Sequence, residues 1–151
     1  MKVLVAVDGS EYSAAAVEEV AKLQWPADTE ICLLSAAEEF RYPAYDAWLL
    51  PGKYHAEVME ASRINAHRIV TEHESALRER IRGQVKITTD VVAGDPKSVV
   101  IDAAEQWPAD LVVIGSHGYS ALPRLLLGSV SSAVANHVHC SVWIVRHPLG
   151  E

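Results

Sequence analysis

Short apolar runs rich in Val, Ile and Leu recur along this chain, separated by segments with helical spacing. Such runs are typical of strands that are buried on both faces of a parallel sheet. The expected strands are Val3–Val7, Ile31–Leu34, Leu111–Ile114 and Val142–Val145, with Val85–Val92 as a weaker, alternating case. Strands that alternate with helices predict an α/β fold, a doubly wound parallel sheet with helices on both faces.

Local signals place several element boundaries. Ser10 is the expected N-cap of a first helix. Asp95 and Pro96 have the order of an N-cap followed by a first helical residue. A long helix is predicted over about Lys53 to Arg82, where apolar residues recur at helical spacing among charges. Ahead of it, Glu38 to Gly52 has aromatics and two prolines but no period, which predicts an irregular loop.

Composition narrows the class of protein. The 151 residues carry a net charge of −7 and contain no Gly/Ser linker, so one domain spanning 1–151 is expected. An acidic surface disfavours nucleic acid as a partner. No apolar run approaches the length of a membrane helix, so no membrane association is expected. Two cysteines, Cys32 and Cys140, make no disulfide framework, and a cytoplasmic location is expected.

A pentapeptide, QWPAD, occurs twice, at Gln24–Asp28 and Gln106–Asp110. Each copy follows an expected helix and precedes an expected strand. Because proline cannot continue a helix, the repeat is interpreted as one type of helix–strand connector used twice, not as a repeat architecture.

Glycines follow the fourth expected strand with the spacing G-x2-G-x9-G-S, formed by Gly115, Gly118, Gly128 and Ser129. The next segment, Val130 to His139, is predicted to be helical. Phosphates need close backbone approach, free N–H donors and a favourable dipole, which glycines before a helix start provide. The alternative is that each glycine closes a turn. The position between a strand and a helix favours phosphate binding.

Neither of the common phosphate-binding signatures is present. The chain has no G-x4-G-K-[ST], and no G-x-G-x-x-G occurs near the first strand. The hydroxyls of Ser129 and Ser131 would add hydrogen-bond donors to the glycine segment. The segment is therefore predicted to bind phosphate by a different arrangement.

Several segments together resemble the universal stress protein family. They are Val5–Ser13, Gly94–Pro96, Asp110–Gly118, Leu127–Ser131 and Cys140–Arg146. They span nearly the whole chain in the order that the family has. The G-x2-G-x9-G-[ST] spacing is the mark of the family's ATP-binding branch.

This resemblance implies a Rossmann-like five-stranded sheet with strand order 3-2-1-4-5 and ATP at the ends of the first and fourth strands, with or without Mg²⁺ held through the phosphates. It implies that Ala6, Val7 and Asp8 line the adenosine, that Ile114 and Gly115 flank the ribose, and that Gly118, Gly128, Ser129, Val130 and Ser131 hold the phosphates. It also implies a homodimer through the last strand, at Val142, Trp143, Ile144 and Val145.

Some individual residues keep two interpretations. Asp8 could bind ribose or a hydrated metal ion, or it could cap the helix that begins near Ser10. His117 could meet a phosphate or point to solvent, and Arg124 could neutralise a γ-phosphate or be a solvated surface residue. His137–Cys140 is not expected to bind a metal, because helical residues two apart point in different directions.

Three functions follow from these observations. The first is an adenine-nucleotide-binding regulatory protein of the stress response, in which ATP occupancy acts as a conformational signal. The second is a slow ATP hydrolase, although no residue is identified as a catalytic base. The third is a nucleotide-independent homodimeric scaffold, which the intact glycine spacing disfavours.

Overall fold

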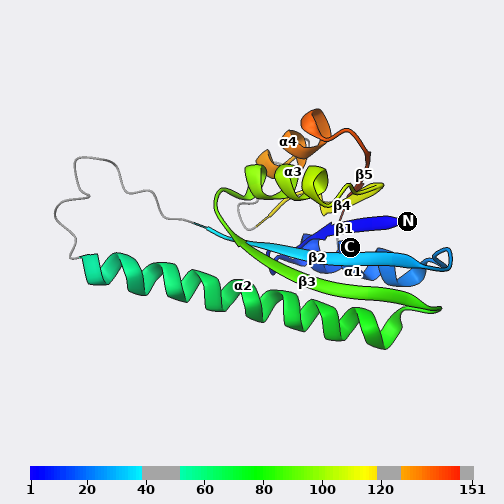
Figure 1. The fold of residues 1–151 in the computed structure, drawn as a ribbon, viewed down its shortest axis with the longest axis horizontal. Helices are drawn as coiled ribbons and strands as arrows, with labels where there is room; N and C mark the ends of the chain where they lie inside the picture. Colours follow the sequence, from blue (N-terminus) through cyan, green and yellow to red (C-terminus); the bar gives the residue numbers. More distant parts are fainter. Residues whose placement is uncertain (39–51, 119–126, 147–151) are drawn as a thin grey trace, which may run out of the picture.

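Five parallel strands form one sheet, in the order β3-β2-β1-β4-β5 (Figure 1), in a computed structural model that describes residues 1–38, 52–118 and 127–146. The strands are β1 Lys2–Ala6, β2 Thr29–Ala37, β3 Val85–Ala93, β4 Leu111–Gly115 and β5 Ser141–Val145. The helices are α1 Glu11–Lys22, α2 Gly52–Arg80, α3 Pro96–Gln106 and α4 Ser129–His137. The predicted fold and strand order are confirmed. The loop predicted over Glu38 to Gly52 falls on residues 39–51, outside the described residues.

The central strand β1 explains why the apolar runs are continuous. Val3 and Val5 pack in the core beneath α1 and α2, whereas Leu4 and Ala6 pack beneath α3 and α4. Successive side chains of a strand point to opposite faces, so a strand covered on both faces needs apolar residues at every position. Figure 1 shows the two pairs of helices on the two sides of the sheet.

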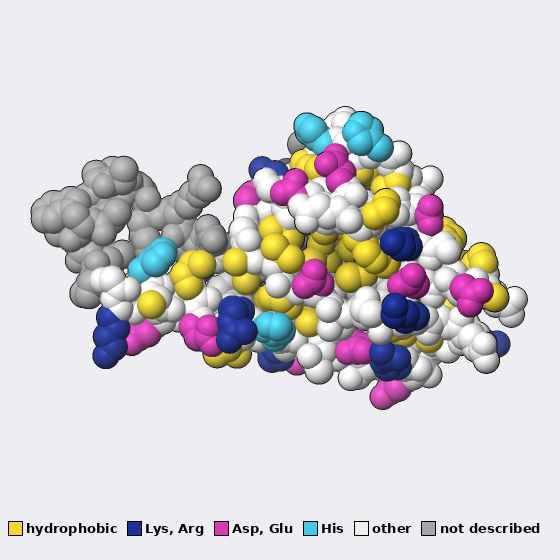
Figure 2. Space-filling view, viewed as in Figure 1, with side chains coloured by type: hydrophobic (Ala, Val, Ile, Leu, Met, Phe, Trp, Pro, Cys, Tyr) yellow, Lys and Arg dark blue, Asp and Glu magenta, His cyan; other side chains and the backbone are white. Residues whose placement is uncertain are grey.

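The two faces are covered unequally. β2 and β3 have nine residues each, whereas β1, β4 and β5 have five each. On one face α2, with 29 residues, lies along β2 and β3. On the other face α3 and α4 are short, and Figure 2 shows hydrophobic side chains still visible between α3 and β3. Partly exposed residues on this side include Cys32, Ala36 and Ile101.

Helix α2 contacts the sheet through its second half. Its buried residues are Ala66, Ile69, Val70 and Leu77. Its first half extends past the end of the sheet (Figure 1), and Tyr54 and Ile64 are exposed there. Among the described residues, no helix is both long and apolar enough to span a bilayer.

The expected helix starts are confirmed. The Ser10 side chain accepts a hydrogen bond from the Ser13 amide, and Asp95 accepts one from the Ser98 amide, with Pro96 as the first residue of α3. These side chains satisfy amides that have no partner within the helix.

The QWPAD connectors place one tryptophan on each face of the sheet. Trp25 packs against the core beneath α1 and α2 and donates its indole N–H to the Val20 carbonyl, 2.9 Å away. Trp107 packs against the opposite core, and its ring lies 5.2 Å from the Lys2 ammonium. The repeat therefore has a structural role in both layers.

The packing of α2 gives the first prediction. Leu77 is fully buried, and Leu77→Ala is expected to lower the free energy of unfolding by about 2–5 kcal/mol, because it removes transfer energy and leaves a cavity. Ile64 lies on the same helix with 58% of its surface exposed, and Ile64→Ala should change stability by less than about 0.5 kcal/mol. Urea unfolding of both variants measures the difference. Equal losses would contradict the packing described for α2.

Candidate functional site

The ends of β1 and β4 lie next to each other at the centre of the sheet. Ala6 pairs with Ile114, and Val7, Asp8 and Gly115 follow at the same edge. The strand order changes direction between β1 and β4, since β2 and β3 lie on one side and β5 on the other. Ligands of doubly wound sheets bind at this switch point. The structure therefore brings together the residues expected around the nucleoside.

Asp8 lies directly against Gly118. A Cβ atom at Gly118 would be 2.6 Å from Asp8 Oδ2, so no side chain fits there unless Asp8 moves. The other oxygen, Oδ1, accepts hydrogen bonds from the Ser10 amide (3.0 Å) and the Ser10 hydroxyl (2.6 Å). Asp8 thus organises the turn into α1, although Ser10 is the N-cap, and its Oδ2 lies beside Gly118.

The first turn of α4 presents main-chain donors. Its first hydrogen bond runs from the Ser132 amide to the Gly128 carbonyl, 2.9 Å, so the amides of Ser129, Val130 and Ser131 come before the helical bonding pattern begins. The N-cap residue Gly128 makes no side-chain cap bond to them. Three N–H groups and the positive end of the helix dipole suit an anion.

Ser116 joins this helix start to the sheet. Its carbonyl accepts from the Gly128 amide (2.8 Å) and the Ser131 hydroxyl (3.0 Å), and its amide donates to the Val145 carbonyl (2.7 Å). The Gly128 amide and the Ser131 hydroxyl are therefore engaged within the protein. The open donors come from the helix start, not from the glycine that precedes it.

Close contact with the same strand end favours glycine at position 128. A Cβ atom there would lie 3.0 Å from the Ser116 carbonyl oxygen and 3.2 Å from His117 Cα. Sequence reasoning missed the role of Ser116, since no spacing rule marks a serine whose main chain makes the bonds. Arg124, which could have met a phosphate, lies outside the described residues.

His117 is directed into the protein. Its ring centroid lies 5.2 Å from that of Tyr12 in α1, and its Nδ1 lies 3.2 Å from the Ser116 hydroxyl. Its Nε2 is buried with no hydrogen-bond partner. Tyr12 also touches Gly115, where a Cβ atom would be 2.8 Å from the Tyr12 main chain. The start of α1 thus packs against the glycine segment, a contact that the sequence pattern did not indicate.

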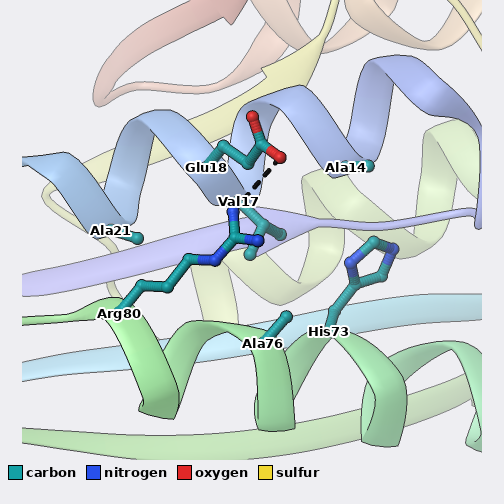
Figure 3. A pocket seen from close by; sticks show the side chains of 7 residues that line it. All are labelled: Ala14, Val17, Glu18, Ala21, His73, Ala76 and Arg80. Atoms are coloured by element: carbon teal, nitrogen blue, oxygen red, sulfur yellow. Dashed lines mark hydrogen bonds and ion pairs between the residues drawn. The ribbon is translucent and has the colours of Figure 1, made fainter.

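A separate hollow lies between α1 and α2 (Figure 3). Small side chains form its walls, the Glu18–Arg80 ion pair (3.3 Å) lies at one end, and His73 lies at the other. It is lined by Ala14, Val17, Glu18, Ala21, His73, Ala76 and Arg80. Its cation is already paired and its walls are mostly methyl groups, so this hollow does not suit a phosphate.

Over residues 1–38, 52–118 and 127–146, no three His, Cys, Asp or Glu side chains form a metal-binding group.

The fold and strand order define a Rossmann-like α/β protein in which unbonded amides of a helix start lie near the switch point of the sheet. The model of the Universal stress protein family matches residues 1–146, and the chain belongs to this family. It is 30% identical to universal stress protein Sll1388 of Synechocystis sp. over an alignment of 154 residues, and this alignment covers 97% of this chain and 97% of that protein.

Solved structures agree on the fold. The hypothetical protein MJ0577 is 23% identical with a TM-score of 0.82, covering 99% of this chain and 97% of that one. A universal stress protein in complex with cAMP is 23% identical with a TM-score of 0.61, and the match covers 96% of this chain and 95% of that one. An Arabidopsis thaliana family protein with AMP bound, At3g01520, is 18% identical with a TM-score of 0.60, covering 97% and 92%.

His73 gives a prediction about pH. Partial burial lowers the pKa of His73 from its ordinary value of 6.5, while the carboxylates of Glu72 and Asp8 act in the opposite direction. The stability contributed by neutral His73 is thus fully present above pH 6.5, and it is lost as the pH falls from 6.5 through the lower folded pKa.

His73→Gln is therefore expected to reduce the loss of unfolding free energy between about pH 7 and pH 5, as measured by urea unfolding at each pH. His67 is exposed on the same helix, and His67→Gln serves as the matched control. The unfolding free energy of this control should change with pH as it does in the parent protein. A parent-like slope in the His73 variant would contradict the assignment.

Proposed function

We propose that this chain binds an adenine nucleotide across the ends of β1 and β4, with the phosphates against the first turn of α4. The observation that carries the proposal is the row of amides at Ser129, Val130 and Ser131, which precede the first helical bond and have no capping side chain. A helix start with this geometry favours an anion through both its N–H groups and its dipole.

The residues divide into three groups along the nucleotide. Ala6, Val7 and Asp8 line the adenosine, Ile114 and Gly115 flank the ribose, and the phosphates lie against Ser129, Val130 and Ser131, with Gly118 and Gly128 leaving space for them. A carboxylate accepts hydrogen bonds, so Asp8 Oδ2 suits a ribose hydroxyl. Ser129 is exposed and offers both its amide and its hydroxyl, whereas Ser131 offers its amide because its hydroxyl is engaged.

ATP is the nucleotide that the resemblance to the family's ATP-binding branch favours, through the G-x2-G-x9-G-S spacing. Two family structures, one with cAMP and one with AMP, support an adenine nucleotide in general. Mg²⁺ would be held through the phosphates, since the described residues form no metal-binding group of their own. Both cysteines are free thiols, which suits the cytoplasm as the site of action.

Nucleotide occupancy is proposed to act as a stress-response signal through Ser116. The Ser116 carbonyl holds the start of α4, and its amide holds Val145 at the end of β5. A ligand that draws the first turn of α4 toward its phosphates therefore acts on the residue that fixes the end of the edge strand. Binding and any β5 contact would then be linked reciprocally.

Two rival functions remain testable. A slow hydrolase needs an aligned water and a base at the γ-phosphate, and Asp8 Oδ1 is already bonded to Ser10 at the nucleoside side. Single-turnover assays with radiolabelled ATP distinguish hydrolysis from binding. Mass spectrometry of the small molecule released from denatured protein, with titrations of ATP, AMP and cAMP, tests binding itself. No affinity for any of the three would favour a nucleotide-independent scaffold.

Gly118→Val is the sharpest test of the site. Its side chain would enter the space beside Asp8 Oδ2, and the affinity for ATP is expected to fall by at least about tenfold, or about 1.4 kcal/mol. Calorimetry measures the affinity, and circular dichroism shows that the domain still folds. Gly52→Val is the control, because a Cβ atom there meets nothing within 4 Å. Unchanged affinity in the Gly118 variant would refute the site.

Gly128→Val is expected to abolish binding as well, but it is a poorer test. Its Cβ would press on main-chain atoms of Ser116 and His117. A loss of binding would therefore combine exclusion of phosphate with local distortion of the strand end.

The edge strand β5 is proposed to pair with a second copy, giving a homodimer through Val142, Trp143, Ile144 and Val145. The first three of these side chains are partly exposed, and an unpaired apolar edge is normally covered. The Val145 carbonyl accepts from the Ser116 amide, which follows β4, so odd-numbered residues of β5 direct their main-chain groups toward β4. Because these directions alternate along a strand, the N–H and C=O groups of Val142 and Ile144 point outward at the open edge.

Val142→Pro should therefore convert the dimer to a monomer. Proline removes one outward N–H and leaves the bonds to β4 intact. Val142→Thr is the control, since threonine keeps both the N–H and the branched shape. Sedimentation equilibrium measures the mass. A dimer that persists in the proline variant would place the contact elsewhere.

A further inference from the structure

Strand β3 forms the opposite edge of the sheet, and within the described part of the chain no further strand pairs with its outer side. It has nine residues, and most of its side chains are exposed, including Lys86, Thr88, Thr89 and Asp90. Its neighbour β2 pairs with it along the whole length of both strands. A long unpaired edge is a template for another strand unless something occupies it.

Two hydrogen bonds show which main-chain groups point outward. The Gly94 amide donates to the Ala37 carbonyl at the end of β2, so even-numbered positions face β2. The Ile87 carbonyl accepts from the Arg78 side chain of α2. Because successive residues of a strand direct these groups to opposite sides, the odd-numbered positions from Val85 to Ala93 present theirs at the open edge.

Arg78 occupies one of the outward carbonyls of this edge, that of Ile87. Its Nη2 lies 3.0 Å from the Ile87 carbonyl oxygen, and Glu74 Oε1 holds the guanidinium at 2.9 Å from Nε and 2.7 Å from Nη2. Figure 1 shows α2 running alongside β3, which brings the arginine to the strand. A partner strand would need the same carbonyl.

The sequence of β3 is complementary to itself. In an antiparallel pair with Thr88 on the two-fold axis, Lys86 of each copy faces Asp90 of the other, and Ile87 faces Thr89. The outward groups of Ile87 and Thr89 are then the ones that bond, while Lys86 and Asp90 form the closer, non-bonded type of pair. Opposite charges at such positions stabilise a sheet. Lys86 contacts Glu30 at 3.1 Å but has 67% of its side chain exposed, so it remains accessible to a partner.

From these contacts we propose that β3 is a pairing edge for a second copy of this chain, and that the Arg78–Glu74 pair keeps it closed. The occupant is specified by the symmetric arrangement of Lys86, Thr88 and Asp90. The surface is separate from β5, and the inference does not depend on nucleotide binding.

The test uses the full chain carrying Val142→Pro, so that pairing through β5 does not contribute to the mass. Addition of Arg78→Ala is expected to strengthen self-association at least about tenfold, measured as the dissociation constant in sedimentation velocity. Arg68→Ala is the matched control, because Arg68 forms the same type of exposed i,i+4 pair, with Glu72, on the same helix. It should leave the mass unchanged.

Charge exchange identifies the surface. Asp90→Lys in the Arg78→Ala background should abolish the added association, since lysine would then face Lys86. Combining it with Lys86→Asp should restore the association.

Should Arg78→Ala fail to fold by circular dichroism, Glu74→Ala takes its place, because it removes the carboxylate that holds the arginine. The expected change in self-association has the same direction. Three results would overturn the proposal. They are an unchanged mass when Arg78→Ala is added, an equal gain of self-association with Arg68→Ala, or self-association that Asp90→Lys does not reduce.

Discussion

The main chain of Ser116 is the constraint on which the candidate site depends. One carbonyl receives both the Gly128 amide and the Ser131 hydroxyl, and the adjacent amide bonds to Val145. These bonds fix where α4 begins, and hence where its unbonded amides lie relative to the ends of β1 and β4. They also explain the glycine at position 128, since the helix approaches the strand end so closely that a side chain there would require the strand end to shift.

The two edges of the sheet differ in chemistry. β5 ends the sheet with partly exposed apolar side chains, whereas β3 carries lysine, threonine and aspartate, and its Ile87 carbonyl is occupied by an arginine. Natural sheets limit unwanted pairing with cover from neighbouring elements, and on β3 the Arg78 side chain of α2 provides such cover. The contrast makes β5 the edge more suited to a lasting contact.

Most of the fold could be predicted from the sequence because burial on both faces leaves a strong signal. Continuous apolar runs such as Val3–Val7 located the central strands, and Ser10 and Asp95 marked helix starts by known capping chemistry. The site was predictable in outline, since the glycine spacing placed a helix start after a strand. The role of each single residue toward a ligand is tested by the binding experiments on the glycine variants.

The details that could not be predicted depend on tertiary contacts. Nothing in the pattern indicates that Tyr12 packs on Gly115, that His117 points inward, or that Ser116 engages the Gly128 amide. These contacts join segments that are far apart in the chain, and they arise from how closely α1 and α4 approach the strand ends. Residue spacing along one element carries no record of that distance.

The projecting half of α2 has a consequence for the effect of dissolved ions. Beyond the sheet, the helix has little core to pack against, and local pairs such as Glu60 with Arg63, 2.7 Å apart, supply part of its support. Exposed pairs of this kind are weakened by screening. The helical order of this arm therefore depends more on ionic strength than that of the half anchored by Ile69, Val70 and Leu77, which is held mainly by burial.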